Sequence, residues 1–127
     1  MNGMLSPSLE NYLKEIYILC SYHSTARVSE IAAKMEVSKA SASRAVSILE
    51  SKNLVCKSSD RTLYLTPEGL NNATFILNRH NTIKTFFSVI LNVPPSVAEK
   101  DACNFEHTIS LDCLHSMSQF LKIKDCK

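Results

Sequence analysis

The apolar residues near the start of the chain recur at spacings of three and four positions. They are preceded by Ser6-Pro7 and comprise Leu9, Tyr12, Leu13, Ile16, Tyr17 and Cys20. This spacing forms one apolar stripe along an α-helix, and Ser followed by Pro is typical of a helix start. The pattern therefore predicts a first helix over about 7–22.

Two short helices separated by a tight turn are predicted next. The first covers residues 27–35 with Ser29 as its cap, and the second begins at Ser38 and extends to 49. The large apolar residues of the second helix come late, whereas small and polar residues fill its first two turns. Such a helix packs by its C-terminal half, so its N-terminal half is free to approach a partner closely.

A hairpin and three further helices complete the pattern. The β-prone runs 54–57 and 62–66 are separated by Ser58-Ser59-Asp60-Arg61. A long amphipathic helix over about 67–92 follows, and two more helices extend to about 108 and 122. We therefore expect a mainly α fold, with a winged helix-turn-helix domain over 1–66 and a helical domain over 67–127.

The composition favours a globular protein of the cytoplasm. Hydrophobic residues make up 45% and charged residues 20% of the 127 positions, which argues against extensive disorder. No apolar run reaches the roughly 18 residues of a membrane span, and the first residues do not resemble a signal peptide. The five cysteines are scattered without any C-x-x-C pair, so neither a disulfide framework nor a zinc finger is expected.

Positive charge concentrates in the predicted helix pair and hairpin. Residues 27–61 contain seven Lys or Arg against four Asp or Glu, an excess of three, whereas the whole chain carries +2. In a winged helix-turn-helix the second helix enters the major groove of double-stranded DNA, which makes DNA the expected partner. Arg44 is the candidate for a guanine contact and Arg61 for a phosphate contact. The full set of predicted DNA-binding residues is Arg27, Ser38, Lys39, Ser41, Ser43, Arg44 and Arg61.

Alternatives to DNA binding remain open for these residues. Each of them alone also fits a solvated polar position, and a winged helix can bind protein instead of DNA. Absence of any salt-dependent affinity for duplex DNA would favour the protein-binding alternative.

A second candidate site lies near residue 105. Cys103, Glu106 and His107 are spaced i, i+3 and i+4, so on a helix they share one face. Thiolate, carboxylate and imidazole are ligands of divalent transition metals. A cysteine facing the core beside a surface glutamate and histidine has the same spacing, so the triplet alone does not decide. A metalloenzyme is not expected, because the chain has no H-E-x-x-H motif and only two glycines.

Five separated segments agree in order and spacing with a known family. They are residues 8–17, 26–32 and 65–69, the pair Arg79-His80, and residues 102–107 with the pattern A-C-x-x-E-H. Over nearly the whole chain they resemble the diphtheria toxin repressor family of iron- and manganese-dependent regulators. The short length resembles the manganese branch, which lacks an SH3-like domain.

The resemblance implies a homodimeric transcriptional repressor controlling metal-ion homeostasis genes, with dimerisation and metal binding in the C-terminal helices. The implied partner is a near-palindromic operator. The implied metal ligands are Asn11, His80, Cys103, Glu106 and His107. Fe²⁺ or Mn²⁺ is the expected metal, with Zn²⁺ or Co²⁺ as alternatives.

Three departures from the family affect this expectation. Asn11 stands where the family has Met or Asp, and Lys14 and Lys84 stand where manganese regulators carry acids. Because an ammonium does not ligate a metal, we expect one metal per chain, with a partial second site of His80 and Glu99 as the alternative. The alternative function is a regulator of the same family that has lost its metal dependence, with Lys14 or Lys84 supplying positive charge.

Overall fold

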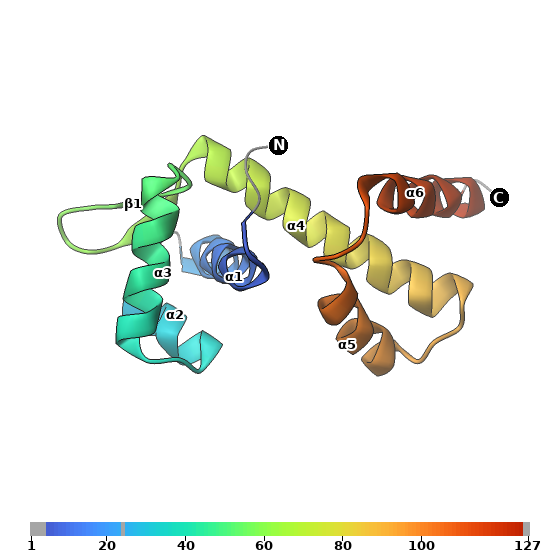
Figure 1. Cartoon of the computed structure of the whole chain (residues 1–127), viewed down its shortest axis with the longest axis horizontal. Helices are drawn as coiled ribbons and strands as arrows, with labels where there is room; N and C mark the ends of the chain where they lie inside the picture. The colour runs from blue at the N-terminus through green and yellow to red at the C-terminus, as the bar shows by residue number, and fades with distance from the viewer. Residues whose placement is uncertain (1–4, 24, 126–127) are drawn as a thin grey trace. The chain divides into compact units, whose positions relative to one another are not determined.

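The computed structural model describes residues 5–23 and 25–125. The chain folds into two compact units, Met1–Ile76 and Leu77–Lys127, and Figure 1 shows the order of their helices. The boundary between the units falls within a helix. The predicted domain limits, 1–66 and 67–127, therefore stay a prediction.

Unit 1 contains the helix pair and the hairpin. Its elements are α1 (Pro7–His23), α2 (Val28–Met35), α3 (Lys39–Ser51), β1 (Val55–Lys57), β2 (Leu63–Leu65) and the first half of α4 (Pro67–Thr85). The two strands are antiparallel with Cys56 opposite Tyr64, and an isolated bridge joins Ala26 to Leu63. This element order is that of the predicted winged helix-turn-helix.

The core of unit 1 forms where the apolar stripes of the three helices meet. Its most deeply buried side chains are Leu13, Ile16, Ile31, Val46, Leu49, Leu54 and Leu63. On α3 the early residues Ser43 and Arg44 are exposed, whereas Val46 and Leu49 are fully buried. The C-terminal half of α3 therefore holds the helix in the core, as its sequence predicts.

The starts of α2 and α3 are capped in different ways. Ser38 caps α3, because its Oγ accepts a hydrogen bond from the N–H of Ser41 at 3.0 Å. The prediction that Ser29 caps α2 is wrong. Arg27 occupies the N-cap position, and its backbone N–H donates to the carboxylate of Glu30 at 2.9 Å. A glutamate three residues into a helix reaches back in this way, so Ser29 lies inside the first turn.

The start of α4 lies against the backbone before β1. Thr66 caps the helix, since its Oγ1 accepts from the N–H of Gly69 at 2.9 Å. A Cβ at position 69 would lie 1.9 Å from the carbonyl oxygen of Leu54, so only glycine allows this close approach.

Unit 2 contains the rest of α4, a π-helical turn η1 (Phe86–Ile90), α5 (Pro95–Phe105) and α6 (Leu111–Asp125). The long helix expected to reach about 92 thus ends as an α-helix at Thr85 and continues as a π-helix to Ile90. Helix α5 ends three residues before the expected position 108, because Glu106, His107 and Thr108 form a turn.

The packing of unit 2 leaves much apolar surface uncovered. Ile83, Ala98 and Ala102 are fully buried, and the rings of Phe87 and Phe105 stack with centroids 6.2 Å apart. The large apolar side chains that remain exposed in this unit are Val89, Leu91, Val97, Phe105, Leu111, Phe120 and Ile123. Within the described residues, no helix combines the length and the apolar character that crossing a membrane requires.

Candidate metal centre and DNA-binding surface

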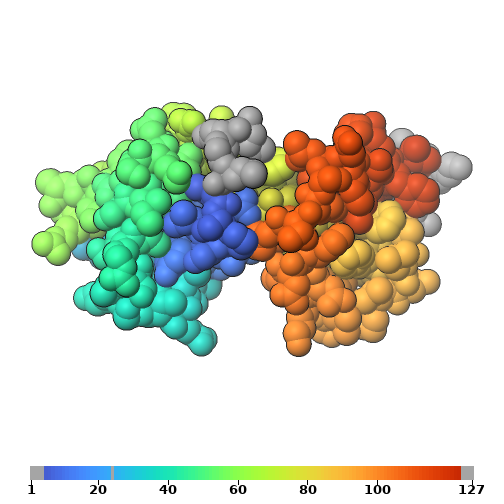
Figure 2. Space-filling view, viewed as in Figure 1, coloured from blue at the N-terminus to red at the C-terminus, as the bar shows by residue number. Residues whose placement is uncertain are grey.

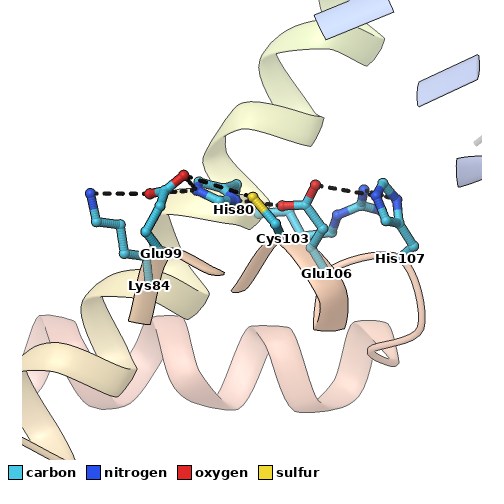
Figure 3. A network of polar contacts seen from close by, with 7 residues as sticks. His80, Lys84, Glu99, Cys103, Glu106 and His107 are labelled. Atoms are coloured by element: carbon cyan, nitrogen blue, oxygen red, sulfur yellow. Dashed lines mark hydrogen bonds and ion pairs between the residues drawn. The ribbon is translucent and has the colours of Figure 1, made fainter. Parts of the chain in front are cut away.

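His80 on α4 lies at the centre of a polar network in unit 2. Its Nδ1 is 2.6 Å from Oε1 of Glu106, and its Nε2 is 3.1 Å from both carboxylate oxygens of Glu99. The side chain of Glu106 is 1% exposed and that of His80 8%, whereas Glu99 is 48% exposed. His80 therefore links a buried carboxylate to one at the surface (Figure 3).

Two histidines flank the buried carboxylate of Glu106. The second is His107, whose Nε2 lies 3.4 Å from Oε2 of Glu106 and whose Nδ1 lies 3.4 Å from the guanidinium of Arg79. Burial of a carboxylate is costly unless positive charge or hydrogen bonds compensate for it. The imidazoles of His80 and His107 lie next to this buried carboxylate, one at each of its oxygens.

Glu99 contacts three side chains on the exposed side of the network. Besides His80, the ammonium of Lys84 lies 3.2 Å from Oε1, and the thiol of Cys103 donates to Oε2 at 3.7 Å. The hydrogen bond from His80, with a further contribution from Lys84, holds the pKa of the Glu99 carboxyl below its usual value. Glu99 is therefore a carboxylate at neutral pH.

The donor set of this network fits a divalent transition metal. One ligand atom each from His80, Glu99 and Cys103 lies within 4.8 Å of the others, so small side-chain adjustments bring all three within reach of one ion. An imidazole nitrogen, a carboxylate oxygen and a thiolate sulfur are ligands of Fe²⁺, Co²⁺, Zn²⁺ and Mn²⁺.

The structure places the predicted metal ligands in two surroundings. His80, Glu106 and His107 come together in the buried part of the network, and Cys103 lies at its exposed edge beside Glu99. Helix α5 ends at Phe105 and Glu106 is its C-cap with helical dihedrals, so the shared face of Cys103, Glu106 and His107 stays a prediction. Asn11 lies half-buried on α1 in unit 1, and its place among the ligands stays a prediction.

Glu99 is not among the ligands that the sequence predicts for the main metal site, and the sequence suggests it only for a partial second site with His80. The signal that finds it is its spacing from Cys103, because residues four apart on a helix are neighbours. The ion pair between Lys84 and Glu99 has no such signal, because it joins α4 to α5.

The predicted DNA-binding residues on α3 form an accessible surface in unit 1. Lys39, Ser43 and Arg44 are exposed, and neither the ammonium of Lys39 nor the guanidinium of Arg44 has a hydrogen bond or ion pair with another described residue. A shallow hollow beside Arg44 is lined by Ala40, Ser43, Arg44, Ser47 and Ile48. Ser38 and Ser41 are hydrogen-bonded to each other in the cap of α3.

The remaining two predicted DNA-binding residues are connected with the wing. Arg61 lies in the turn between β1 and β2 and is exposed. Arg27, by contrast, donates from its guanidinium to the carbonyl oxygen of Asp60 at 3.2 Å. Arg27 therefore ties the start of α2 to the wing.

Both halves of the chain match known families of sequence. Residues 4–63 match the N-terminal DNA-binding domain of the iron-dependent repressors. Residues 66–125 match the metal-binding and dimerisation domain of the same repressors.

The relatives of known name cover most of the chain. The transcriptional regulator MntR of Listeria monocytogenes is 33% identical over 94% of this chain and 85% of its own length. The diphtheria toxin repressor of Corynebacterium diphtheriae is 30% identical over 93% of this chain, which spans only 52% of that longer protein.

Solved structures agree with the sequence matches. The manganese regulator SloR is 30% identical, with a TM-score of 0.79 over 93% of this chain and 55% of its own. The regulator ScaR, solved with bound Zn²⁺, is 26% identical, with a TM-score of 0.80 over 90% of this chain and 53% of its own. The predicted fold class, a winged helix-turn-helix followed by a helical domain, is confirmed. The chain belongs to the iron-dependent repressor family, the metal-dependent transcriptional repressors that include the diphtheria toxin repressor.

Proposed function

We propose that this repressor binds one divalent transition metal per chain in unit 2, through His80, Cys103, Glu106 and His107, and that the metal increases its affinity for an operator. The observation that carries the proposal is the buried group of His80, Glu106 and His107 with Cys103 and Glu99 at its edge. These side chains supply nitrogen, oxygen and sulfur ligands, so Fe²⁺, Mn²⁺, Zn²⁺ and Co²⁺ are all suitable. Asn11 is included as a candidate ligand on the strength of the sequence resemblance alone.

The ion pair between Lys84 and Glu99 is the reason for proposing one metal and not two. The ammonium of Lys84 already supplies positive charge to the carboxylate at 3.2 Å. Because any cation next to Glu99 has to overcome repulsion from that ammonium, His80, Glu99 and Cys103 supply ligands for no more than one ion.

Metal control requires that the ion binds the DNA-competent conformation more tightly than other conformations. Metal binding to His80 also replaces its contact with one of its two carboxylates, because an imidazole binds a metal through one nitrogen that carries no hydrogen. The metal thus replaces the existing bonds of the network and rearranges its side chains.

We further propose that two copies read a near-palindromic operator. The exposed apolar residues of unit 2, including Leu111, Phe120 and Ile123, supply surface for the dimer. A two-fold dimer presents two recognition helices to two half-sites, which matches a sequence with two-fold symmetry. In each copy Lys39, Ser43 and Arg44 of α3 would face the bases and phosphates of the major groove.

The test is selection of the operator from random duplexes, followed by titration of the selected duplex with metal. Wild type should bind the selected duplex more tightly with added Mn²⁺, Zn²⁺ or Fe²⁺ than with a chelator. The titration with Fe²⁺ is done under anaerobic conditions. Cys103→Ala should need at least about 10-fold more metal for half-maximal binding, because loss of a ligand costs at least as much as loss of a group that supports one. Cys113→Ala removes an exposed thiol from α6 and is the matched control.

Two outcomes would contradict the proposal. If wild type binds the selected duplex equally well with metal and with chelator, the protein is a family member whose DNA binding does not depend on metal. If Cys103→Ala and Cys113→Ala behave alike while the metal effect persists, the ligand set is wrong.

A further inference from the structure

The turn that joins β1 to β2 has an unusual backbone for its sequence. Figure 2 shows this turn projecting from the surface of unit 1. Arg61 has a φ of 70°, in the left-handed region that favours glycine. Its N–H donates to the carbonyl of Ser58 at 2.9 Å, and the N–H of Ser58 donates to the carbonyl of Thr62 at 2.9 Å. Some interaction has to hold a side-chain-bearing residue in this conformation.

Asp60 makes that interaction. Its carboxylate accepts hydrogen bonds from the hydroxyl of Ser58, from the hydroxyl of Thr62 at 2.8 Å and from the backbone N–H of Thr62 at 3.3 Å. These donors lie on both sides of Arg61 in the turn. They lower the pKa of Asp60 to about 2, with the bond from Ser58 as the largest cause, so the group is fully charged at neutral pH.

The turn is also fixed to the rest of unit 1. The guanidinium of Arg27 donates to the carbonyl oxygen of Asp60 at 3.2 Å, and Ala26 pairs with Leu63 through hydrogen bonds of 3.2 and 2.7 Å. The base of the turn is thus fixed beside α2, and Asp60 at its tip is tied to Arg27 through its carbonyl oxygen.

An exposed carboxylate is unfavourable on a surface that approaches phosphates, because like charges repel. Arg61, next to it, is exposed, and its guanidinium has no hydrogen bond or ion pair with any residue that the structure describes. The carboxylate thus lowers the positive charge of the wing, while its hydrogen bonds to Ser58 and Thr62 enclose the turn in which Arg61 lies.

We propose that Asp60 is a positioning residue, which holds the wing in the conformation that presents the guanidinium of Arg61 to a DNA phosphate. The inference rests on the proposed DNA binding and adds a role for a residue of opposite charge to the DNA-binding set. It requires that removal of Asp60 weakens DNA binding even though the removal makes the protein more positive.

A double-mutant cycle tests the coupling between the two residues. The full chain, loaded with Mn²⁺, is titrated onto a short mixed-sequence duplex at several salt concentrations, and binding is followed by fluorescence anisotropy. Arg61→Ala should reduce the magnitude of the slope of log K against log[salt] by about one, because one phosphate contact is lost. Asp60→Ala should weaken binding and lower the slope similarly, and the double variant should be no weaker than Arg61→Ala.

Further variants distinguish the position of the turn from the charge of Asp60 and from a loss of folding. Ser58→Ala with Thr62→Val removes the hydroxyl donors but keeps the charge of Asp60, so it should reproduce the loss seen in Asp60→Ala. Ser59→Ala, in the same turn and without a described hydrogen bond, should bind as wild type does. Thermal unfolding of each variant, measured in parallel, should show that unit 1 remains folded.

The outcomes distinguish the inference from the proposed function. Tighter binding by Asp60→Ala, or losses that add in the double variant, would overturn the positioning role while leaving DNA binding intact. Absence of salt-dependent duplex binding by wild type would overturn both.

Discussion

His80 contacts one buried and one exposed carboxylate, and the difference in burial makes the two contacts unequal in their contribution to stability. The bond to Glu106 joins side chains that are 8% and 1% exposed, whereas Glu99 on the other side is 48% exposed. Solvent screens the outer pair, so it contributes little to stability, but it cannot screen the inner pair in the same way. Single substitutions on the two sides should therefore have unequal effects.

We expect His80→Ala to lower the free energy of unfolding of the metal-free protein by about 3 kcal/mol, because Glu106 stays buried without its nearest donor. Glu99→Ala should cost less than about 1 kcal/mol, as is usual for an exposed pair. Denaturant unfolding in the presence of a chelator measures both values. Equal losses would mean that the buried bond to Glu106 has no special weight.

Asp60 provides a prediction of pH dependence. Its pKa is about 2 in the folded chain against an ordinary 3.8, so its ionised form stabilises the fold above about pH 4. That contribution should fade as the pH falls from about 4 to 2. Asp60→Asn should therefore be less stable than wild type at neutral pH, and the difference should disappear as the pH falls below about 2. NMR titration of the carboxyl carbon of Asp60 would show the lowered midpoint directly, and a midpoint near 3.8 would contradict it.

The sequence correctly predicts those helices and turns whose formation depends on residues close together in the chain. The apolar spacing of α1, the late apolar residues of α3 and the turn before β2 each depend on residues close together in the chain, and the structure has all three. The end of α5 differs from its prediction. The residue types of 104–108 allow the helix to continue, but Glu106 is its C-cap and the side chain of Glu106 contacts His80 of α4. Contacts between distant segments carry no periodic signal.

The start of α4 illustrates such a contact. Gly69 and Leu54 are fifteen positions apart, yet a methyl group at 69 would overlap the carbonyl oxygen of Leu54 at 1.9 Å. We expect Gly69→Ala to lower the free energy of unfolding by about 1–3 kcal/mol, although alanine is the better helix former. Asn71→Ala, at an exposed position two residues further on, should be neutral or slightly stabilising. Thermal unfolding compares the two, and a stabilising Gly69→Ala would show that the backbone relaxes there.

For the whole molecule, the family resemblance predicts more than the residue pattern does. Spacing alone leaves Cys103, Glu106 and His107 undecided between a metal site and an ordinary surface. The match of residues 66–125 to the iron-dependent repressors establishes a metal-binding and dimerisation domain there. The role of Lys84 beside Glu99 follows only from the structure, because it depends on how α4 and α5 pack.

Metal binding should be visible in the stability of the whole chain. An ion present at about 100 times its dissociation constant raises the free energy of unfolding by about 2.7 kcal/mol if it binds only the folded state. We expect this increase with Mn²⁺ or Zn²⁺ for wild type and Cys113→Ala, and a clearly smaller one for Cys103→Ala at the same metal concentration. Calorimetric melting with and without chelator measures the increase. A full increase in Cys103→Ala would exclude the thiol from the ligands.

The left-handed backbone of Arg61 also limits how the wing can vary by mutation. Asn, Asp and Gly adopt that backbone most readily, whereas only Lys and Arg carry the positive charge, so no residue type meets both demands without cost. Saturation mutagenesis under a repression reporter should therefore accept far fewer replacements at position 61 than at Ser59. If Arg61→Gly or Arg61→Asn preserved repression as well as Arg61→Lys does, only the backbone of the turn, and not the positive charge at position 61, would matter for repression. The wing tip is thus expected to be a place where this repressor tolerates little sequence drift, despite being one of its most exposed points.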